Sequence, residues 1–232
     1  MRVHNLLRLK EYSDFLTDHN QILEEQVSER TAQLKEAYRD TMFTLVRAAE
    51  RKDAESGQHV RRISHYCRAL TAAMDVPIEL QDTICDASPM HDIGKIGLSD
   101  RVLNTKFIEL PLADAKVYRT HTTMGEKTLN TLDDMQSVAA IIRSHHEYFN
   151  GTGFPDSLTG KAISIGARIV AIVEAYEELQ SGDYAKAEST PADAVRVILS
   201  NKGTLFCPEM TDVFVRLYAA NNLCSPSAIP SF

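Results

Sequence analysis

The first 56 residues contain neither glycine nor proline, and this absence constrains the fold more than any other feature. Both residue types interrupt helices, so we expect one long helix over residues 1–50. Beyond it, apolar residues recur at the spacing of a helix, and proline or glycine marks the boundaries. The expected helices cover 41–75 with a break at 56–57, 78–92, 111 onward through 121, 134–148, 165–179, 190–201 and 208 onward, with a loop at 99–111. The predicted fold is all-α, with an N-terminal helix at 1–44, a helical domain at 45–222 and an unstructured tail at 223–232.

The N-terminal helix carries the repeat of a coiled coil, since Leu9, Leu16 and Leu23 are spaced seven residues apart. The second core position of that repeat falls on Leu6, Asn20, Val27 and Leu34. A single asparagine there, with leucine at the other position, is typical of a parallel two-stranded coiled coil. We therefore expect a homodimer through this helix. An amphipathic helix packed on its own domain is the alternative.

Composition excludes several classes of function. The 232 residues are 44% hydrophobic, enough for one sizeable core, and carry a net charge of −7 with a pI of about 5.6. This acidity argues against a nucleic acid polymer as partner. The sequence contains no apolar run as long as a membrane span and no signal peptide, so we expect a cytoplasmic protein with no membrane partner. The four cysteines lack CxxC spacing and are expected to be reduced.

His91 and Asp92 are adjacent in the stretch MHDIGKIG, and both side chains can bind a metal ion. The carboxylate of Asp92 has two oxygens, so it can bridge two ions. Lys95 follows three residues after Asp92 and four after His91, which would place its ammonium on the same helical face as both and beside an anionic substrate. An isolated His-Asp pair is weak support for a site, so further ligands are needed.

Other histidines supply such ligands. Glu55 and His59 are four residues apart and would face the same way on a helix. His121 stands alone, and a lone histidine is more often an ordinary core or surface residue. The tandem pair His145 and His146 precedes the glycine-rich stretch FNGTGFP, which favours a site. A set of histidines and carboxylates without a thiolate suits Fe, Mn or Zn.

With these residues in place, the chain resembles the HD-GYP domains, a branch of the HD metal-dependent phosphohydrolases. The matching segments follow the family order and together cover roughly residues 45–220. They are DAESGQHVRRIS (53–64), SPMHDIGKIGLSDRVL (88–103), HTTMG (121–125), HHEYFNGTGFPDSLTG (145–160) and ARIVAIVEAYEEL (167–179). The resemblance implies an HD-type helical bundle behind the N-terminal helix.

The resemblance further implies a metal-dependent phosphodiesterase that hydrolyses cyclic di-GMP to pGpG and/or GMP through a metal-activated hydroxide. It implies two or three divalent ions, with Fe or Mn favoured over Zn, Ni or Mg, and catalytic roles for Asp92 and Lys95. The implied ligands are Glu55, His59, His91, Asp92, His121, His145, His146 and Glu174, and the implied substrate contacts are Lys95, Gly153, Phe154, Pro155 and Lys186. The opening RVHNLLRLK resembles the segment that follows the receiver domain in two-component response regulators. An upstream receiver domain or a signalling partner protein is therefore expected.

Some positions depart from the family pattern. Glu174 stands where the family usually has Asp, Phe154 replaces the tyrosine of the GYP motif, and Asn150 replaces an Asp. Asp183 occupies the position of a phosphate-binding arginine, and a negative charge there weakens the case for cyclic di-GMP. Two alternatives therefore stay open. One is a catalytically weak module that binds a nucleotide or a signalling partner, and the other is a phosphohydrolase for another cyclic dinucleotide or a nucleotide.

Overall fold

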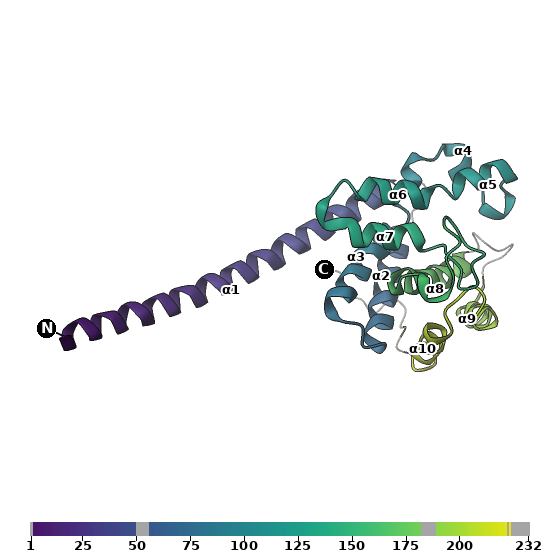
Figure 1. Ribbon diagram of the computed structural model, residues 1–232. Coiled ribbons are helices and arrows are strands. Elements are labelled where there is room, and N and C mark those ends of the chain that lie inside the picture. Colours follow the sequence, from purple (N-terminus) through teal and green to yellow (C-terminus); the bar gives the residue numbers. More distant parts are fainter. Residues whose placement is uncertain (1, 50–55, 182–188, 222, 224–232) are drawn as a thin grey trace. The chain divides into compact units, whose positions relative to one another are not determined.

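The computed structural model describes residues 2–49, 56–181, 189–221 and 223 (Figure 1). The chain divides into two compact units, Met1–Met42 and Phe43–Phe232. Some positions singled out in the sequence lie outside the described residues, and the expectations for them stay predictions. These positions are Glu55, Asp183, Lys186 and the tail at 224–232.

Helix α1 (Arg2–Ala49) supplies the first unit and runs without interruption over 48 residues, as the sequence predicts. Several apolar side chains of the heptad pattern are exposed on it, namely Leu16, Leu23, Val27 and Leu34. The coiled-coil dimer itself stays a prediction. Within the part of the chain that the structure describes, no helix is both long and apolar enough to cross a membrane.

The second unit is helical, and its described residues include no strand. Its α-helices are α2 (Ser56–Ala73), α3 (Ile78–Met90), α4 (Asp100–Leu103), α5 (Leu112–Tyr118), α6 (His121–Leu129), α7 (Gln136–Ser144), α8 (Ile165–Ser181), α9 (Pro191–Ser200) and α10 (Pro208–Ala219). Short 3₁₀ helices add η1 (Ile93–Gly97), η2 (Phe107–Glu109), η3 (Asp133–Met135) and η4 (Gly160–Ala162). The all-α prediction is confirmed.

Helix α8 forms the centre of this bundle and packs against α2, α3, α7, α9 and α10 (Figure 1). Ile169, Ile172, Val173 and Tyr176 are all buried on α8, as their spacing predicts. A polar side chain on the inner face of such a helix has little access to water. It therefore needs a partner within the protein.

The helix expected over residues 78–92 ends earlier, at Met90. Asp92 leaves the helical conformation with φ −98° and ψ 7°, and its carbonyl accepts the amide hydrogen of Lys95 to begin η1. The prediction that Lys95 shares a helical face with His91 is therefore wrong. The 3₁₀ turn nevertheless brings the ammonium of Lys95 onto the carboxylate of Asp92.

A second, smaller core lies under residues 98–118 and contains Val102 and Tyr118, with Phe107 packed against it. It explains why the prediction of a loop over residues 99–111 is wrong. The apolar residues of this stretch are covered by folding it into α4 and η2. Hydrophobic burial between α4, η2 and α5 decides the local conformation.

The histidines of the pattern lie at helix ends. The single helix expected from Pro111 through His121 is two helices, α5 and α6, and His121 is the first residue of α6. The helix expected over residues 134–148 ends at Ser144, so the tandem histidines follow α7. The last carbonyls of a helix lack partners within it, which leaves them available to side chains that follow.

Gly94 allows η1 and α6 to touch through their backbones. A Cβ atom on Gly94 would lie 1.9 Å from the carbonyl oxygen of His121 and 2.5 Å from the amide nitrogen of Gly125. No larger residue fits without moving one of the two elements. The HDIGK and HTTMG motifs are therefore held in direct contact.

We expect Gly94→Ala to lower the free energy of unfolding by roughly 3 kcal/mol, because a backbone cannot move aside as a flexible side chain can. Chemical denaturation followed by circular dichroism measures this change. Lys127→Ala, an exposed substitution on α6, is the control and should have little effect. Equal stability of Gly94→Ala and the unsubstituted chain would mean that η1 and α6 do not touch.

Candidate metal centre

Buried histidines and carboxylates from the ends of α3, α6 and α7 and from the middle of α8 gather at one place in the second unit. They form two groups, and within each group the ligand atoms all lie within 4.8 Å of one another. The first group is His121, His145 and His146, and the second is His91, Asp92 and Glu174. All of these residues are among the ligands that the sequence predicts.

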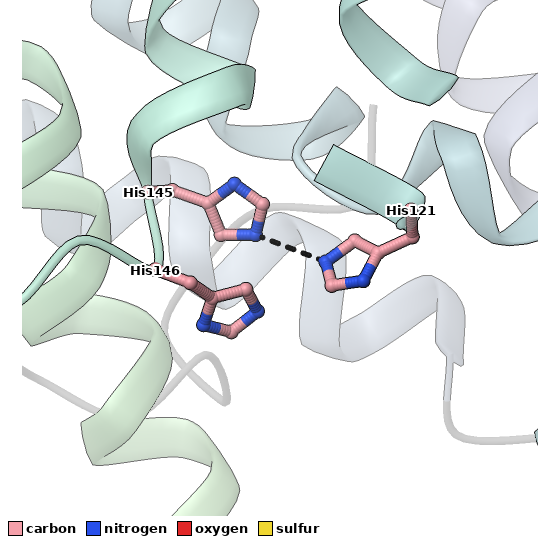
Figure 2. A group of neighbouring side chains, drawn as sticks. All are labelled: His121, His145 and His146. Atoms are coloured by element: carbon pink, nitrogen blue, oxygen red, sulfur yellow. Dashed lines mark hydrogen bonds between the residues drawn. The ribbon is translucent and has the colours of Figure 1, made fainter. Parts of the chain in front are cut away.

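Figure 2 shows the first group. His145 and His146 follow the end of α7, and His121 approaches them from the start of α6. The Nε2 atoms of His121 and His145 are 3.5 Å apart, and the ring centroids of His145 and His146 are 4.2 Å apart. The three rings therefore lie close together in the interior of the domain.

Three of the histidines at the centre are oriented in the same way. Each one donates its Nδ1 hydrogen to the backbone carbonyl three residues earlier, at the end of the preceding helix or turn. His91 bonds to Ser88 (2.7 Å), His121 to Tyr118 (2.7 Å) and His145 to Ile142 (2.5 Å). This bond fixes the ring and leaves Nε2 facing the centre, as is usual for histidines that hold a metal.

The same bonds determine the chemistry of the inward nitrogens. A carbonyl only accepts, so Nδ1 carries the hydrogen, and a neutral ring has none on Nε2. Burial lowers the pKa of His121 to about 4 and the pKa of His145 well below its usual range, so both rings are neutral at pH 7. Their Nε2 lone pairs therefore face each other in the contact drawn in Figure 2, which cannot be a hydrogen bond between neutral rings. A cation between them would turn this repulsion into attraction.

Asp92 belongs to the second group and also faces the first. Its Oδ2 atom is 3.3 Å from Nε2 of His91, and its Oδ1 atom is 3.5 Å from Nε2 of His121. Glu174 also faces both groups, with Oε1 3.7 Å from His91 and 3.6 Å from His146. The two sets of ligands adjoin, and a carboxylate that faces both is suited to bridge a pair of ions.

Several buried polar atoms at the centre have no hydrogen-bond partner among the described residues. They are Nε2 of His91, Oδ1 of Asp92, Nε2 of His146 and Oε1 of Glu174. Leaving such an atom unpaired costs about 1–3 kcal/mol, so these atoms together call for a ligand. Divalent cations fit this donor set, since it offers only imidazole nitrogens and carboxylate oxygens.

The second group holds protons when no cation is bound. Burial alone would lower the pKa of His91, but the charges of Asp92 and Glu174 outweigh it and raise the pKa to about 10. Burial raises the pKa of Glu174 to about 7. At neutral pH, His91 is therefore protonated and Glu174 is partly protonated, and a metal ion must displace these protons.

Lys95 brings a positive charge to the rim of the centre. Its ammonium contacts Oδ2 of Asp92 and lies 5.1 Å from the ring centroid of Tyr118. Although burial opposes the effect, Asp92 and Tyr118 raise the pKa of Lys95 well above its usual range. The lysine is charged at neutral pH, and 23% of its side chain stays exposed, so it can reach a bound anion.

His59 belongs to neither group of ligand atoms. Its ring centroid is 6.3 Å from that of His91, and its Nδ1 atom is 3.3 Å from Oε2 of Glu177. The same oxygen accepts a hydrogen bond of 2.7 Å from Nε of Arg62. Glu177 is not predicted from the sequence as a site residue, although an acidic residue three positions after Glu174 on an apolar helix was a usable signal.

The glycine-rich loop covers the first group. A Cβ atom on Gly153 would lie 2.2 Å from the amide nitrogen of Tyr148, so the loop can fold this closely only with glycine there. The amide of Phe154 donates to the carbonyl of His146 at 3.2 Å, and its ring stacks on the His146 imidazole with centroids 4.8 Å apart. Pro155 follows and is half-buried. Phe154 thus packs directly against a candidate ligand.

Buried Glu147 anchors this loop, and it is a second residue whose role is not predicted from the sequence. Its two carboxylate oxygens accept hydrogen bonds from the amides of Asp156 (2.6 Å) and Leu158 (3.0 Å). Arg143 on α7 then holds the Asp156 carboxylate in two bonds of 2.7 and 2.8 Å and also contacts Glu126 on α6. A glutamate directly after tandem histidines was the available signal.

Comparison with known families accounts for this arrangement. The model of the HD domain family matches residues 44–210, which include every one of the grouped ligands. The chain belongs to the HD domain family. The resemblance found in the sequence is confirmed at this level.

Relatives of this HD domain protein are enzymes of cyclic dinucleotide metabolism. It is 30% identical over 230 residues to a probable cyclic di-GMP phosphodiesterase of Vibrio cholerae, covering 92% of this chain and 52% of the relative. It is 31% identical over 217 residues to the cyclic di-GMP phosphodiesterase response regulator RpfG of Xanthomonas campestris, covering 93% and 57%. The crystal structure of a cyclic GMP-AMP specific phosphodiesterase of V. cholerae matches with a TM-score of 0.64 at 18% identity, covering 82% of this chain and 51% of that one.

An HDG"Y"P protein of Bdellovibrio bacteriovorus matches with a TM-score of 0.56 at 19% identity, covering 69% of this chain and 51% of that one. At such low identity, the two solved structures support the fold of the HD domain. The chain spans about half the length of the curated relatives it matches.

Metal binding near pH 7 should release between about one and two protons per domain, because His91 is fully protonated and Glu174 partly so before the cation arrives. Calorimetry in buffers of different ionisation enthalpy measures this number. Above its pKa, Glu174 has already lost its proton, so the number of protons released near pH 9 should fall toward one per domain. The affinity for metal should rise with pH. Metal binding without proton release would show that the second group does not take part.

Proposed function

We propose that this chain is a metal-dependent phosphodiesterase that hydrolyses cyclic di-GMP to pGpG and/or GMP. The observation that carries the proposal is the pair of adjoining ligand groups with Asp92 facing both. Bound there, a metal pair supplies Lewis acidity toward a water molecule and toward a phosphodiester. Fe or Mn suits the donor set best, with Zn, Ni or Mg as alternatives. A third ion would require Glu55, which is outside the described residues.

The residues of the chain divide the remaining tasks. Asp92 holds both ligand groups in register, and the neutral imidazoles of His121 and His145 offer lone pairs without repelling a cation. Lys95 remains charged and lies beside Asp92, where it can stabilise negative charge on the phosphate oxygens or on the leaving oxygen. Gly153, Phe154 and Pro155 form a wall next to His146 that limits how a substrate can enter.

The similarity to cyclic di-GMP phosphodiesterases supports cyclic di-GMP as the substrate, and another relative favours one alternative. A protein of V. cholerae that is 29% identical over 184 residues is a 3'3'-cGAMP-specific phosphodiesterase. Together with Asp183, this relative makes another cyclic dinucleotide the second candidate substrate. A catalytically weak binding module is less favoured, because a protein without turnover has no need for a complete set of buried metal ligands. Hydrolysis of both dinucleotides under Mn or Fe, followed by chromatography, separates the three readings.

Substitution of Asp92 by Asn should lower both metal content and turnover, because it removes the charge between the two groups while keeping the shape. The loss of turnover should exceed the roughly 10–100-fold effect typical of residues that only orient a metal ligand. Metal analysis per chain and a hydrolysis assay measure the two quantities. Asp134→Asn, an exposed substitution, is the matched control. Normal metal content and turnover in the Asp92 variant would rule out the dinuclear centre.

We further propose that residues 1–44 form a cytoplasmic linker helix and that residues 45–222 form the catalytic domain. The helix would pair with a second copy of the chain, since Leu16, Leu23 and Val27 expose an apolar stripe at coiled-coil spacing. The similarity to a response regulator supports an upstream receiver domain or signalling partner.

Replacing Leu16 and Leu23 together by Glu should convert a dimer into a monomer, because like charges would meet at the core of the coiled coil. Light scattering measures the mass of the full chain in both forms. Glu24→Gln and Glu25→Gln, placed together on the same helix, test whether a charge change alone has this effect. A dimer that survives the leucine substitutions would place the main interface elsewhere.

A further inference from the structure

Arg119 lies at the turn between α5 and α6, two residues before His121. Its amide donates to the carbonyl of Ala115 at 3.1 Å, and its own carbonyl accepts a hydrogen bond of 3.2 Å from Oγ1 of Thr122. Hydrogen bonds at its amide and its carbonyl thus fix the backbone of Arg119. Its exposed side chain begins close to the candidate ligand His121 in the chain.

The guanidinium of Arg119 lies over the ring of Phe154, with Cζ 5.1 Å from the ring centroid. That ring stacks on the imidazole of His146, whose Nε2 is one of the unpaired atoms of the centre. A cation over an aromatic face is attracted by about 0.5–1 kcal/mol at an exposed site. Phe154 thus contacts both Arg119 and the candidate ligand His146, and the cation–π contact leaves the N–H donors of the guanidinium unused.

Among the described residues, no carboxylate lies within ion-pair distance of Arg119. The same is true of some other arginines of the domain, whereas several are paired. The pairs are Arg62 with Glu177, Arg101 with Asp114, and Arg143 with Glu126 and Asp156. Lys95, the other cation at the rim, already contacts Asp92. Within the described part of the chain, Arg119 is therefore a guanidinium held over Phe154 whose N–H groups meet no carboxylate.

We propose that Arg119 binds the phosphate of the cyclic dinucleotide that is not being hydrolysed. This inference rests on the proposed function. A cyclic dinucleotide carries two phosphodiesters in one ring, so a phosphate held at the metal ligands keeps the second one close by. The planar fork of a guanidinium matches two phosphate oxygens in parallel hydrogen bonds. Arg119 is then a specificity residue that distinguishes a two-phosphate ring from a diester with one phosphate.

The test compares Arg119→Ala, Arg119→Lys and the control Lys116→Ala in the full, metal-loaded chain. Lys116 is an exposed cation on α5, so its removal changes the charge equally. Steady-state kinetics are measured with cyclic di-GMP and with bis(4-nitrophenyl) phosphate, which has a single phosphodiester. Calorimetry with a non-hydrolysable cyclic di-GMP analogue gives the dissociation constant independently of turnover.

For Arg119→Ala, we expect KM for cyclic di-GMP and the dissociation constant of the analogue to rise about tenfold, with a much smaller change in kcat. The effect on the single-phosphate diester should be far smaller, Arg119→Lys should recover part of the loss, and Lys116→Ala should match the unsubstituted chain. Equal losses with both diesters, an equal loss in Lys116→Ala, or no loss at all would overturn the proposal.

Failure of the proposed function gives a different pattern. The unsubstituted chain would then cleave bis(4-nitrophenyl) phosphate but neither cleave cyclic di-GMP nor bind its analogue. That result rejects the substrate, and the role of Arg119 is rejected with it. If the unsubstituted chain binds cyclic di-GMP and only the Arg119 variants bind it more weakly, the proposed function stands and the role of Arg119 is supported.

Discussion

The structure of the domain depends on two imidazole nitrogens, Nε2 of His121 and Nε2 of His145, which face each other with no hydrogen between them. His121 and His145 are neutral because burial lowers their pKa, and their Nδ1 bonds to carbonyls at α5 and α7 hold the two rings in place. Asp92 and Glu174 present the complementary problem, because they are buried carboxylates with unpaired oxygens. Buried lone pairs and buried negative charges each cost free energy when they have no partner. A bound cation would remove this cost.

The ends of the helices position the ligand side chains. A residue just past a helix can fold its side chain back onto a free carbonyl, and the bond directs the opposite ring nitrogen inward. The glycine at position 94 then brings η1 against α6, and the carboxylate of Glu147 fixes the loop that covers His146. Hydrogen bonds between side chains and backbone groups thus position the residues of the centre.

The sequence was sufficient for the parts that depend on local pattern. Helical spacing identified α8 and its buried residues, and residue chemistry identified the ligand pool that the fold collects. It was insufficient where distant packing decides the outcome. The break at residues 119–120 and the folding of residues 99–111 follow from the small core around Tyr118, whose members are separated in the chain. The partnership of His59 with Glu177 spans 118 positions and has no local signature.

The grouped ligands extend from His91 to Glu174 and come from segments that meet only after α3, α6, α7 and α8 have packed together. An unfolded chain cannot offer them at one point, so a cation that binds there selects the folded domain. At a free ion concentration one hundred times the dissociation constant, this linkage would add about 2.7 kcal/mol to the free energy of unfolding. Metal supply would then influence how much of the protein survives heat or proteolysis.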